Sequence, residues 1–204
     1  MADPFPLAGF ARIGLRIVSG IAYGRTEGGL ILTGRKAAPY WAGPFTTDSL
    51  DPAVWSDLMG FLVDCVDRNL RVDFVHPRYL VPRSYTLTSW PLVTDPVLVS
   101  VTNPRTIVVS GLTVGMTLKR GDRLTLIQGE LRCHRMIRAD LVVASAISQS
   151  IALTPLLPTG VFAGGALVRF KNPPIRLAIV PGSFEAEEEY SQSPVTFEAE
   201  EALL

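Results

Sequence analysis

The sequence predicts a mainly β fold of the α+β class: an N-terminal β-sheet with one helix, a small β-barrel or sandwich, and a C-terminal strand-like arm. Three observations lead to this expectation. Between residues 111 and 177, short apolar segments are separated by turns rich in glycine, aspartate and proline. One segment, residues 52–69, carries apolar side chains at helical spacing. Apolar and polar residues alternate at 12–18, 70–75 and 195–199, as in half-buried strands.

These segments predict three parts. We expect an N-terminal α+β domain over residues 1–104, a β-barrel domain over residues 105–183 and an acidic C-terminal arm over residues 184–204. The proline-rich stretch at 91–105 suggests the first boundary because prolines interrupt both helices and strands. The expected arm alternates like a strand in part, so we expect it to pair with a sheet edge of its own chain or of a neighbour.

The N-terminal domain is expected to open on a hairpin made by residues 12–18 and 29–33. The aromatic and proline-rich residues 37–50 predict a loop, with a contact role as the functional alternative. Asp51 as N-cap and Pro52 in the first turn then begin the helix, which we expect to cover a sheet.

Further strands are predicted from residue 85 onward. They are residues 85–90, 97–101, 113–119, 122–127, 130–138, 144–154, 166–170 and 175–180. The tripeptide Arg120–Gly121–Asp122 matches a sequence that integrins bind, but its residue types are also those of an ordinary β-turn. We therefore predict a turn there.

Charge is unevenly distributed. Residues 1–183 hold all 19 lysines and arginines but only 12 of the 19 acidic residues, whereas residues 184–204 hold seven glutamates and no base. Arginine strongly outnumbers lysine, which fits either a GC-rich coding bias or complementary surfaces that meet in an assembly.

Neither a membrane anchor nor a secretion signal is predicted, because no apolar run has the length of a bilayer span and Met1–Pro4 do not begin a signal peptide. We therefore expect synthesis in the cytoplasm. Cys65 and Cys133 are far apart in apolar surroundings, which favours buried free thiols over a disulfide or a metal site.

Few residues suit catalysis. His76 and His134 lack an evident nucleophile partner, and Cys133 next to His134 on a strand points to the opposite face. No phosphate-binding or metal-binding motif is present. We predict no catalytic, cofactor-binding or metal-binding residues, and no enzymatic activity.

Two other functions find little support in the residues. The carboxylates Asp64 and Asp67 on a helix, and Glu187–Glu189 in the acidic arm, do not form an identifiable hydrolase cleft. Arg132, Arg135 and Arg138 suggest a basic stripe, but no aromatic residues are interleaved with them to stack on bases, so nucleic-acid binding is not expected.

The order of these elements resembles small distal tail or baseplate proteins at the tail tip of long-tailed bacteriophages. The resemblance rests on the segments Trp41–Phe45, Trp55–Leu62, Phe74, Leu118–Leu124, Ile151–Leu156, Asn172–Leu177 and Tyr190–Leu203. It covers most of the chain, and it consists of pattern and order rather than of one motif.

This resemblance implies a structural protein of the virion, made in the bacterial host cytoplasm. Copies would form a homo-oligomeric ring that joins the tail tube to the hub or the receptor-binding apparatus. The alternative is a carbohydrate- or receptor-binding β module, in which Tyr40, Trp41 and Trp90 would form an exposed aromatic platform.

Overall fold

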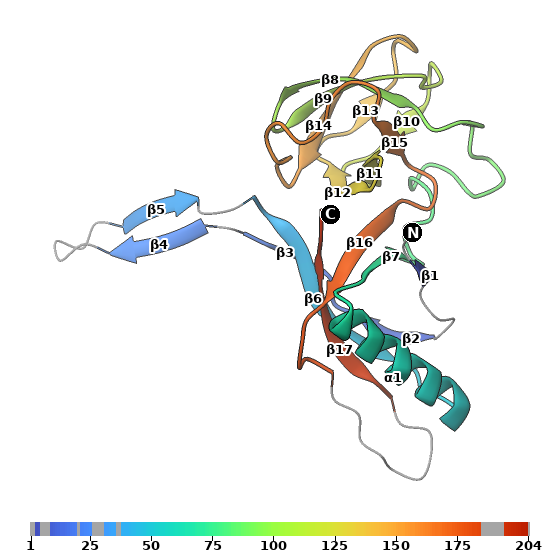
Figure 1. Ribbon diagram of the computed structural model, residues 1–204. Helices are drawn as coiled ribbons and strands as arrows, with labels where there is room; N and C mark the ends of the chain where they lie inside the picture. The colour runs from blue at the N-terminus through green and yellow to red at the C-terminus, as the bar shows by residue number, and fades with distance from the viewer. Residues whose placement is uncertain are drawn as a thin grey trace.

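The computed structural model of this chain combines a curled sheet, one helix and a closed barrel (Figure 1). It describes residues 3–4, 9–19, 21–25, 31–35, 38–184 and 194–203, of which the first, third and fourth ranges are described by their backbone alone. The barrel lies at one end of the sheet, and the helix lies at the other. The predicted fold class, mainly β with one helix and a small barrel, is confirmed.

The sheet has seven strands. In spatial order they are β1 (Asp3–Pro4), β7 (Arg71–Val75), β16 (Pro174–Ile179), β17 (Thr196–Glu201), β6 (Tyr40–Thr47) and β2 (Phe10–Ile13), with β3 (Arg16–Val18) also paired to β6. β1 runs parallel to β7, and the other pairs are antiparallel.

The barrel has six strands. Around the barrel they are β11 (Arg123–Gln128), β12 (Leu131–Ile137), β14 (Gln149–Thr154), β9 (Thr106–Ser110), β8 (Val97–Asn103) and β15 (Leu167–Arg169). The short strands β10 (Thr117–Leu118) and β13 (Leu141–Val142) pair with each other. The strands β4 (Ile21–Arg25) and β5 (Ile31–Arg35) form a separate hairpin that extends away from both sheet and barrel (Figure 1).

Helix α1 (Pro52–Asp67) forms where its residues predict it. Pro52 occupies the first turn, and the helix buries Leu58, Leu62 and Cys65 in the apolar cluster of the sheet. At its C-terminal end Asn69 adopts a φ of 52°, and the amide of residue 70 donates to the carbonyl of Cys65 at 2.8 Å. This left-handed turn ends the helix and starts β7 two residues later.

The predicted loop at 37–50 is wrong, because Tyr40–Thr47 is the long strand β6. Pro44 is tolerated there because β6 has no continuous partner strand on that side. The partner is interrupted between β2 and β3, opposite Pro44. At this break the Gly14 amide donates to the Pro44 carbonyl at 2.8 Å. A Cβ on Gly43 would lie 2.2 Å from the Gly14 carbonyl oxygen, so only glycine fits.

The strands divide between the two units differently from the predicted domain boundaries at 104 and 183. Strand β8, placed by the sequence in the first domain, belongs to the barrel, and β16, placed in the barrel domain, belongs to the sheet. Each unit has its own buried apolar cluster. The barrel is therefore an insertion between β7 and β16, which are neighbours in the sheet.

The C-terminal arm differs from its prediction in position. Residues 196–201 form β17, which lies inside the sheet between β16 and β6 rather than at an edge. Val195, Phe197 and Ala199 are buried, and the Phe197 ring stacks on Phe45 with centroids 5.2 Å apart. Residues 185–193 of the predicted arm lie outside the described residues.

Other predicted strands changed as well. Residues 85–90 form turns, held in part by the Thr86 amide donating to the Ser89 hydroxyl at 2.8 Å, while β9 at 106–110 was not predicted. The strands predicted at 113–119 and 144–154 are shorter, as β10 and β14.

The predicted opening hairpin is also wrong. Its first segment, 12–18, contributes to β2 and β3, and both of these strands pair with β6. The second predicted segment, 29–33, is described only over 31–33, which belong to β5, and β5 pairs with β4.

The buried face of β17 gives the first testable prediction. Replacing Phe197 by alanine should lower the free energy of unfolding by about 3–5 kcal/mol, because the stacked ring leaves a cavity against Phe45. The neighbouring Glu198→Ala, on the exposed face, should change it by less than about 0.5 kcal/mol. Urea unfolding followed by circular dichroism measures both, and equal effects of the two variants would contradict an interior β17.

Candidate functional site

The part of the structure richest in buried polar groups is the junction between sheet and barrel. The chain crosses it twice, through residues 76–96 after β7 and residues 170–173 before β16. Val75 and Pro174, at the two crossings, are paired across the sheet. Three polar features lie at this junction: a buried ion pair, a partly exposed network of charged side chains and a small cavity.

The buried ion pair joins Arg135 of β12 to Glu201 of β17. The Arg135 Nη1 donates to both carboxylate oxygens, at 2.9 and 3.1 Å, and the two side chains are 1% and 2% exposed. The guanidinium also donates to the carbonyls of His134 and Leu156, at 2.6 and 3.2 Å. The charge of Arg135 is therefore matched by one carboxylate and two carbonyl oxygens.

The Glu201 carboxylate accepts two further hydrogen bonds. The backbone amides of His134 and Trp41 donate to it at 2.9 and 3.2 Å. Burial raises the pKa of Glu201, and Arg135 and the two amides oppose this rise. The Trp41 indole Nε1 donates to the His134 carbonyl at 3.0 Å. This cluster links β6, β12 and β17, and its chemistry is that of a structural clamp.

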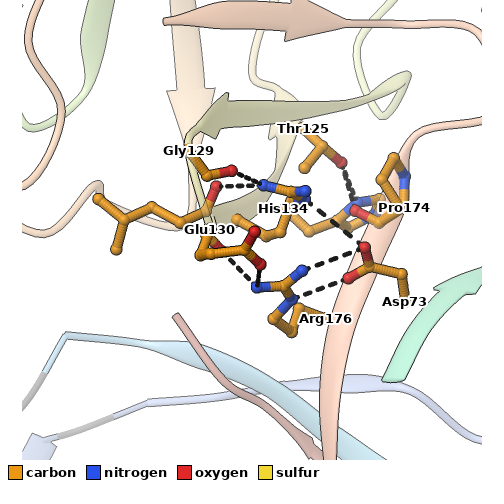
Figure 2. Close-up of polar contacts among 9 residues, drawn as sticks. Asp73, Thr125, Gly129, Glu130, His134, Pro174 and Arg176 are labelled. Carbon is orange, nitrogen blue, oxygen red and sulfur yellow. Dashed lines mark hydrogen bonds and ion pairs between the residues drawn. The ribbon is translucent and has the colours of Figure 1, made fainter. Parts of the chain in front are cut away.

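A second network lies at the surface of the junction, where Arg176 points toward both Asp73 and Glu130 (Figure 2). Arg176 of β16 donates to the two Asp73 oxygens at 2.9 and 3.3 Å, and to the Glu130 carboxylate at 3.2 Å. The hydrogen bond with Asp73 raises the pKa of Arg176, and burial opposes this rise in part. Arg132 lies 3.6 Å from Asp73. The β11–β12 turn of the barrel is thereby fastened to two sheet strands.

His134 lies next to Thr125 and Pro174, close to the Arg176 network (Figure 2). Thr125 Oγ1 donates to the Pro174 carbonyl at 2.7 Å, so it accepts from His134 Nδ1 at 3.0 Å, and the ring is neutral with its proton on Nδ1. Burial, followed by the charges of Arg123 and Arg135, lowers the pKa of His134 to about 3. His134 is thus a neutral part of the junction.

Both histidines line one cavity of the junction, together with arginines. The polar and aromatic residues that line it are Trp41, His76, Arg78, Tyr79, Arg123 and His134. The sequence did not predict this meeting. A pocket that brings a histidine together with carboxylates would favour a hydrolase. The described lining of this cavity contains no carboxylate. The absence of enzymatic activity stays a prediction.

Other residues singled out from the sequence have structural roles. Cys65 and Cys133 are buried free thiols, as predicted, and burial raises the pKa of Cys133. The predicted turn at Arg120–Asp122 is confirmed: Gly121 has a φ of 92°, and Asp122 accepts from the Lys119 amide at 2.7 Å. Asp122 is 2% exposed, and it also binds Arg83, so it is not displayed as an integrin ligand would be.

The predicted arginine stripe does not form. Arg135 is buried and Arg132 is held by Asp73, so only Arg138 of the three is exposed. The aromatic platform is contradicted at its central residue, because Trp41 is 3% exposed. Trp90 is half-buried and packs against Tyr85.

Within the described ranges, no three His, Cys, Asp or Glu side chains come together as metal ligands would. No helix of those ranges combines the length and apolar character needed to cross a bilayer.

Sequence reasoning missed the junction, although one signal for it was present. Val195, just before β17, and Phe197 and Ala199 within it are buried, and the next position in the same alternation is Glu201. An acidic residue at an inward position indicates a buried partner, here Arg135. The identity of the partner is not encoded locally, since 66 positions separate the two.

The buried ion pair gives a second prediction. Glu201→Gln should lower the free energy of unfolding by about 3 kcal/mol or more, because Arg135 would remain buried without a counter-charge. The matched control, Glu200→Gln on the exposed face of the same strand, should change it by less than about 0.5 kcal/mol. Urea unfolding measures both.

A double variant separates the ion pair from simple packing. Arg135→Met combined with Glu201→Leu should be more stable than Glu201→Leu alone, because no unpaired charge is left in the interior. If the free energy of unfolding of the double variant falls by the sum of the losses in Arg135→Met and Glu201→Leu, the two side chains do not stabilise each other as an ion pair would.

His134 predicts a loss of stability in mild acid. Its pKa in the folded protein, about 3, lies below the ordinary 6.5, so stability is fully present above pH 6.5 and falls as the unfolded chain takes up the proton. Between pH 6.5 and about 5 the fall due to this group should approach roughly 1 kcal/mol per pH unit. His134→Asn keeps a donor toward Thr125 and should remove this part of the slope in urea unfolding series. Identical slopes in the two proteins would contradict the assignment.

In comparison with known proteins, no protein-family model matches this chain, and no curated protein matches it significantly.

Proposed function

We propose that this chain is a structural protein of a bacteriophage virion. Its copies assemble into a ring at the tip of a long tail and connect the tail tube to the hub or the receptor-binding apparatus. The protein is made in the cytoplasm of the bacterial host and acts in the virion. The proposal rests on the resemblance in element order and on two surfaces of the structure that suit contact with other chains.

The observation that carries the proposal is the β4–β5 hairpin. Its strands pair with each other over Ile21–Arg25 and Ile31–Arg35 and with no other described strand, and the hairpin extends away from the body (Figure 1). An isolated two-stranded hairpin is at best marginally stable in water. A neighbouring subunit that packs against it would supply the missing contacts, as a heterologous interface in a closed ring does.

A second surface is a row of exposed apolar side chains on the barrel. Val97, Val99 and Val101 of β8 are 37%, 48% and 36% exposed, and Leu167 of β15, which is paired with Val97, is 38% exposed. Contiguous exposed apolar side chains of this kind are typical of protein contact sites. The row therefore supports a role in assembly.

The structure changes the role expected for the acidic residues of the C-terminal arm. The sequence suggested that the acidic arm and the arginine-rich body meet between copies. Within the described residues, Glu201 instead pairs with Arg135 of its own chain. Removal of residues 184–204 would take away the interior strand β17, so such a truncation tests folding rather than assembly.

The fourth prediction tests assembly through the hairpin. Wild-type protein should form rings that are visible by negative-stain electron microscopy and have a discrete mass by native mass spectrometry. Replacing residues 21–35 with a short glycine–serine linker should abolish the rings and leave the thermal unfolding of the body nearly unchanged, because β4 and β5 pair with no other strand in the described part of the chain. Val93→Ser, at a fully exposed valine in the connection before β8, is the control and should keep the rings.

Two results would contradict the proposal: a wild-type protein that stays monomeric at all accessible concentrations, or a hairpin variant with unchanged rings. Antibody labelling of particles released from the producing cells should locate the protein at the tail end.

A further inference from the structure

The cavity at the junction has the size and the charge of a binding site for a small anion. Its volume is about 120 Å³, well below the roughly 300 Å³ at which sites for drug-sized ligands begin. Its walls come from both units: Trp41 and Ile175 belong to the sheet, and Arg123 and His134 belong to the barrel. His76 lies in the connection between them.

Arg123 is the central charge of this cavity. Its guanidinium carbon lies 4.1 Å from the centroid of the Trp41 ring and 4.6 Å from that of Tyr79, so the cation is held between two aromatic faces. Its Nε is buried and has no hydrogen-bond partner among the described residues. Burial lowers the pKa of Arg123, and a hydrogen bond with the Tyr79 side chain partly offsets this fall.

The two buried arginines of the junction differ from Arg123 in one respect. Arg135 is paired with Glu201, and Arg176 is paired with Asp73 and Glu130. No ion pair to Arg123 occurs among the described residues, although the residue is half-buried and burial of an unpaired charge is costly. An anion in the cavity would supply the counter-charge that this guanidinium lacks.

His76 and Arg78 add donors and positive charge. His76 Nδ1 accepts from the Arg78 backbone amide at 3.1 Å, so the neutral ring carries its proton on Nε2 and donates there. The Arg78 side chain is exposed at the cavity, and no ion pair to it occurs within the described ranges. Burial, then the charges of Arg123 and Arg78, lower the pKa of His76, which reflects a positive field in the cavity.

We infer that this cavity binds a small free oxyanion of the phosphate class, with Arg123 and His76 as donors and Arg78 as a further positive charge. The anion would neutralise Arg123 at the contact between sheet and barrel. The competing account is that the two aromatic rings alone satisfy Arg123 and that the cavity takes up no anion. The two accounts differ in what phosphate does to the histidine rings.

The chain has two histidines, and both line this cavity, so their ring signals report on it directly. We would titrate the full-length, isotope-labelled protein with sodium phosphate at neutral pH and constant ionic strength, and follow the rings by two-dimensional NMR. Saturable shifts at millimolar phosphate or below, with a raised pKa of His76, are the expected result. Shifts that do not saturate, or that sodium chloride reproduces, would overturn the inference. An acetate series compares a carboxylate with phosphate, and saturable binding of either supports an oxyanion site.

Variants locate the binding. Arg123→Gln should weaken phosphate binding by about tenfold or more, because it removes a positive charge from the wall of the cavity. Arg78→Gln, an exposed substitution that leaves the fold intact, should weaken it severalfold and keeps the test decisive if Arg123→Gln fails to fold. Arg138→Gln, at an exposed arginine outside the cavity, is the matched control and should bind like wild type. Unchanged affinity in Arg78→Gln and in a folded Arg123→Gln would show that phosphate binds elsewhere.

Discussion

The buried ion pair between Arg135 and Glu201 is the interaction on which the arrangement of this molecule depends. Both charges are almost fully removed from water, and each is tolerated only because backbone groups complete its shell: the amides of Trp41 and His134 for the carboxylate, and the carbonyls of His134 and Leu156 for the guanidinium. Those partners come from the sheet and from the barrel. A shift of one unit against the other would break several of these bonds together, so the pair defines where the barrel sits.

The route of the chain explains why such a tie is needed. The barrel is an excursion between β7 and β16, which lie side by side in the sheet, so the covalent connections hold it at one place only. The Asp73–Arg176–Glu130 network secures the side of the junction next to those crossings, and the Arg135–Glu201 pair secures β12 to β17. A subunit that has to pass load between a tube and an attached apparatus needs two units that do not swing, and this is the property that suits the proposed role.

The sequence predicted what depends on neighbours along the chain and missed what depends on distant contacts. The helix at 52–67, the strand at 71–75 and the turn at Gly121 follow from local spacing and backbone preference. Strand β6 was read as a loop because Pro44 and Gly43 are poor strand residues, and only the break between β2 and β3 makes them acceptable. The acidic character of the C-terminal residues suggested an arm, although the inward residues of β17 are buried. The cavity at the junction was missed for the same reason, since Trp41, His76 and Arg123 meet only through the fold.

The position of β17 has a consequence for how the polypeptide emerges from the ribosome. All six barrel strands lie within residues 97–169, so the barrel can close as soon as that stretch has been translated. The sheet cannot form at that stage, because β6 and β16 both pair with β17, which is made of residues 196–201. During synthesis the earlier half must therefore keep Trp41, Phe45 and the apolar side of α1 uncovered, in a state prone to aggregation. Nascent chains of this protein should engage chaperones until β17 has left the ribosome and paired with β6 and β16.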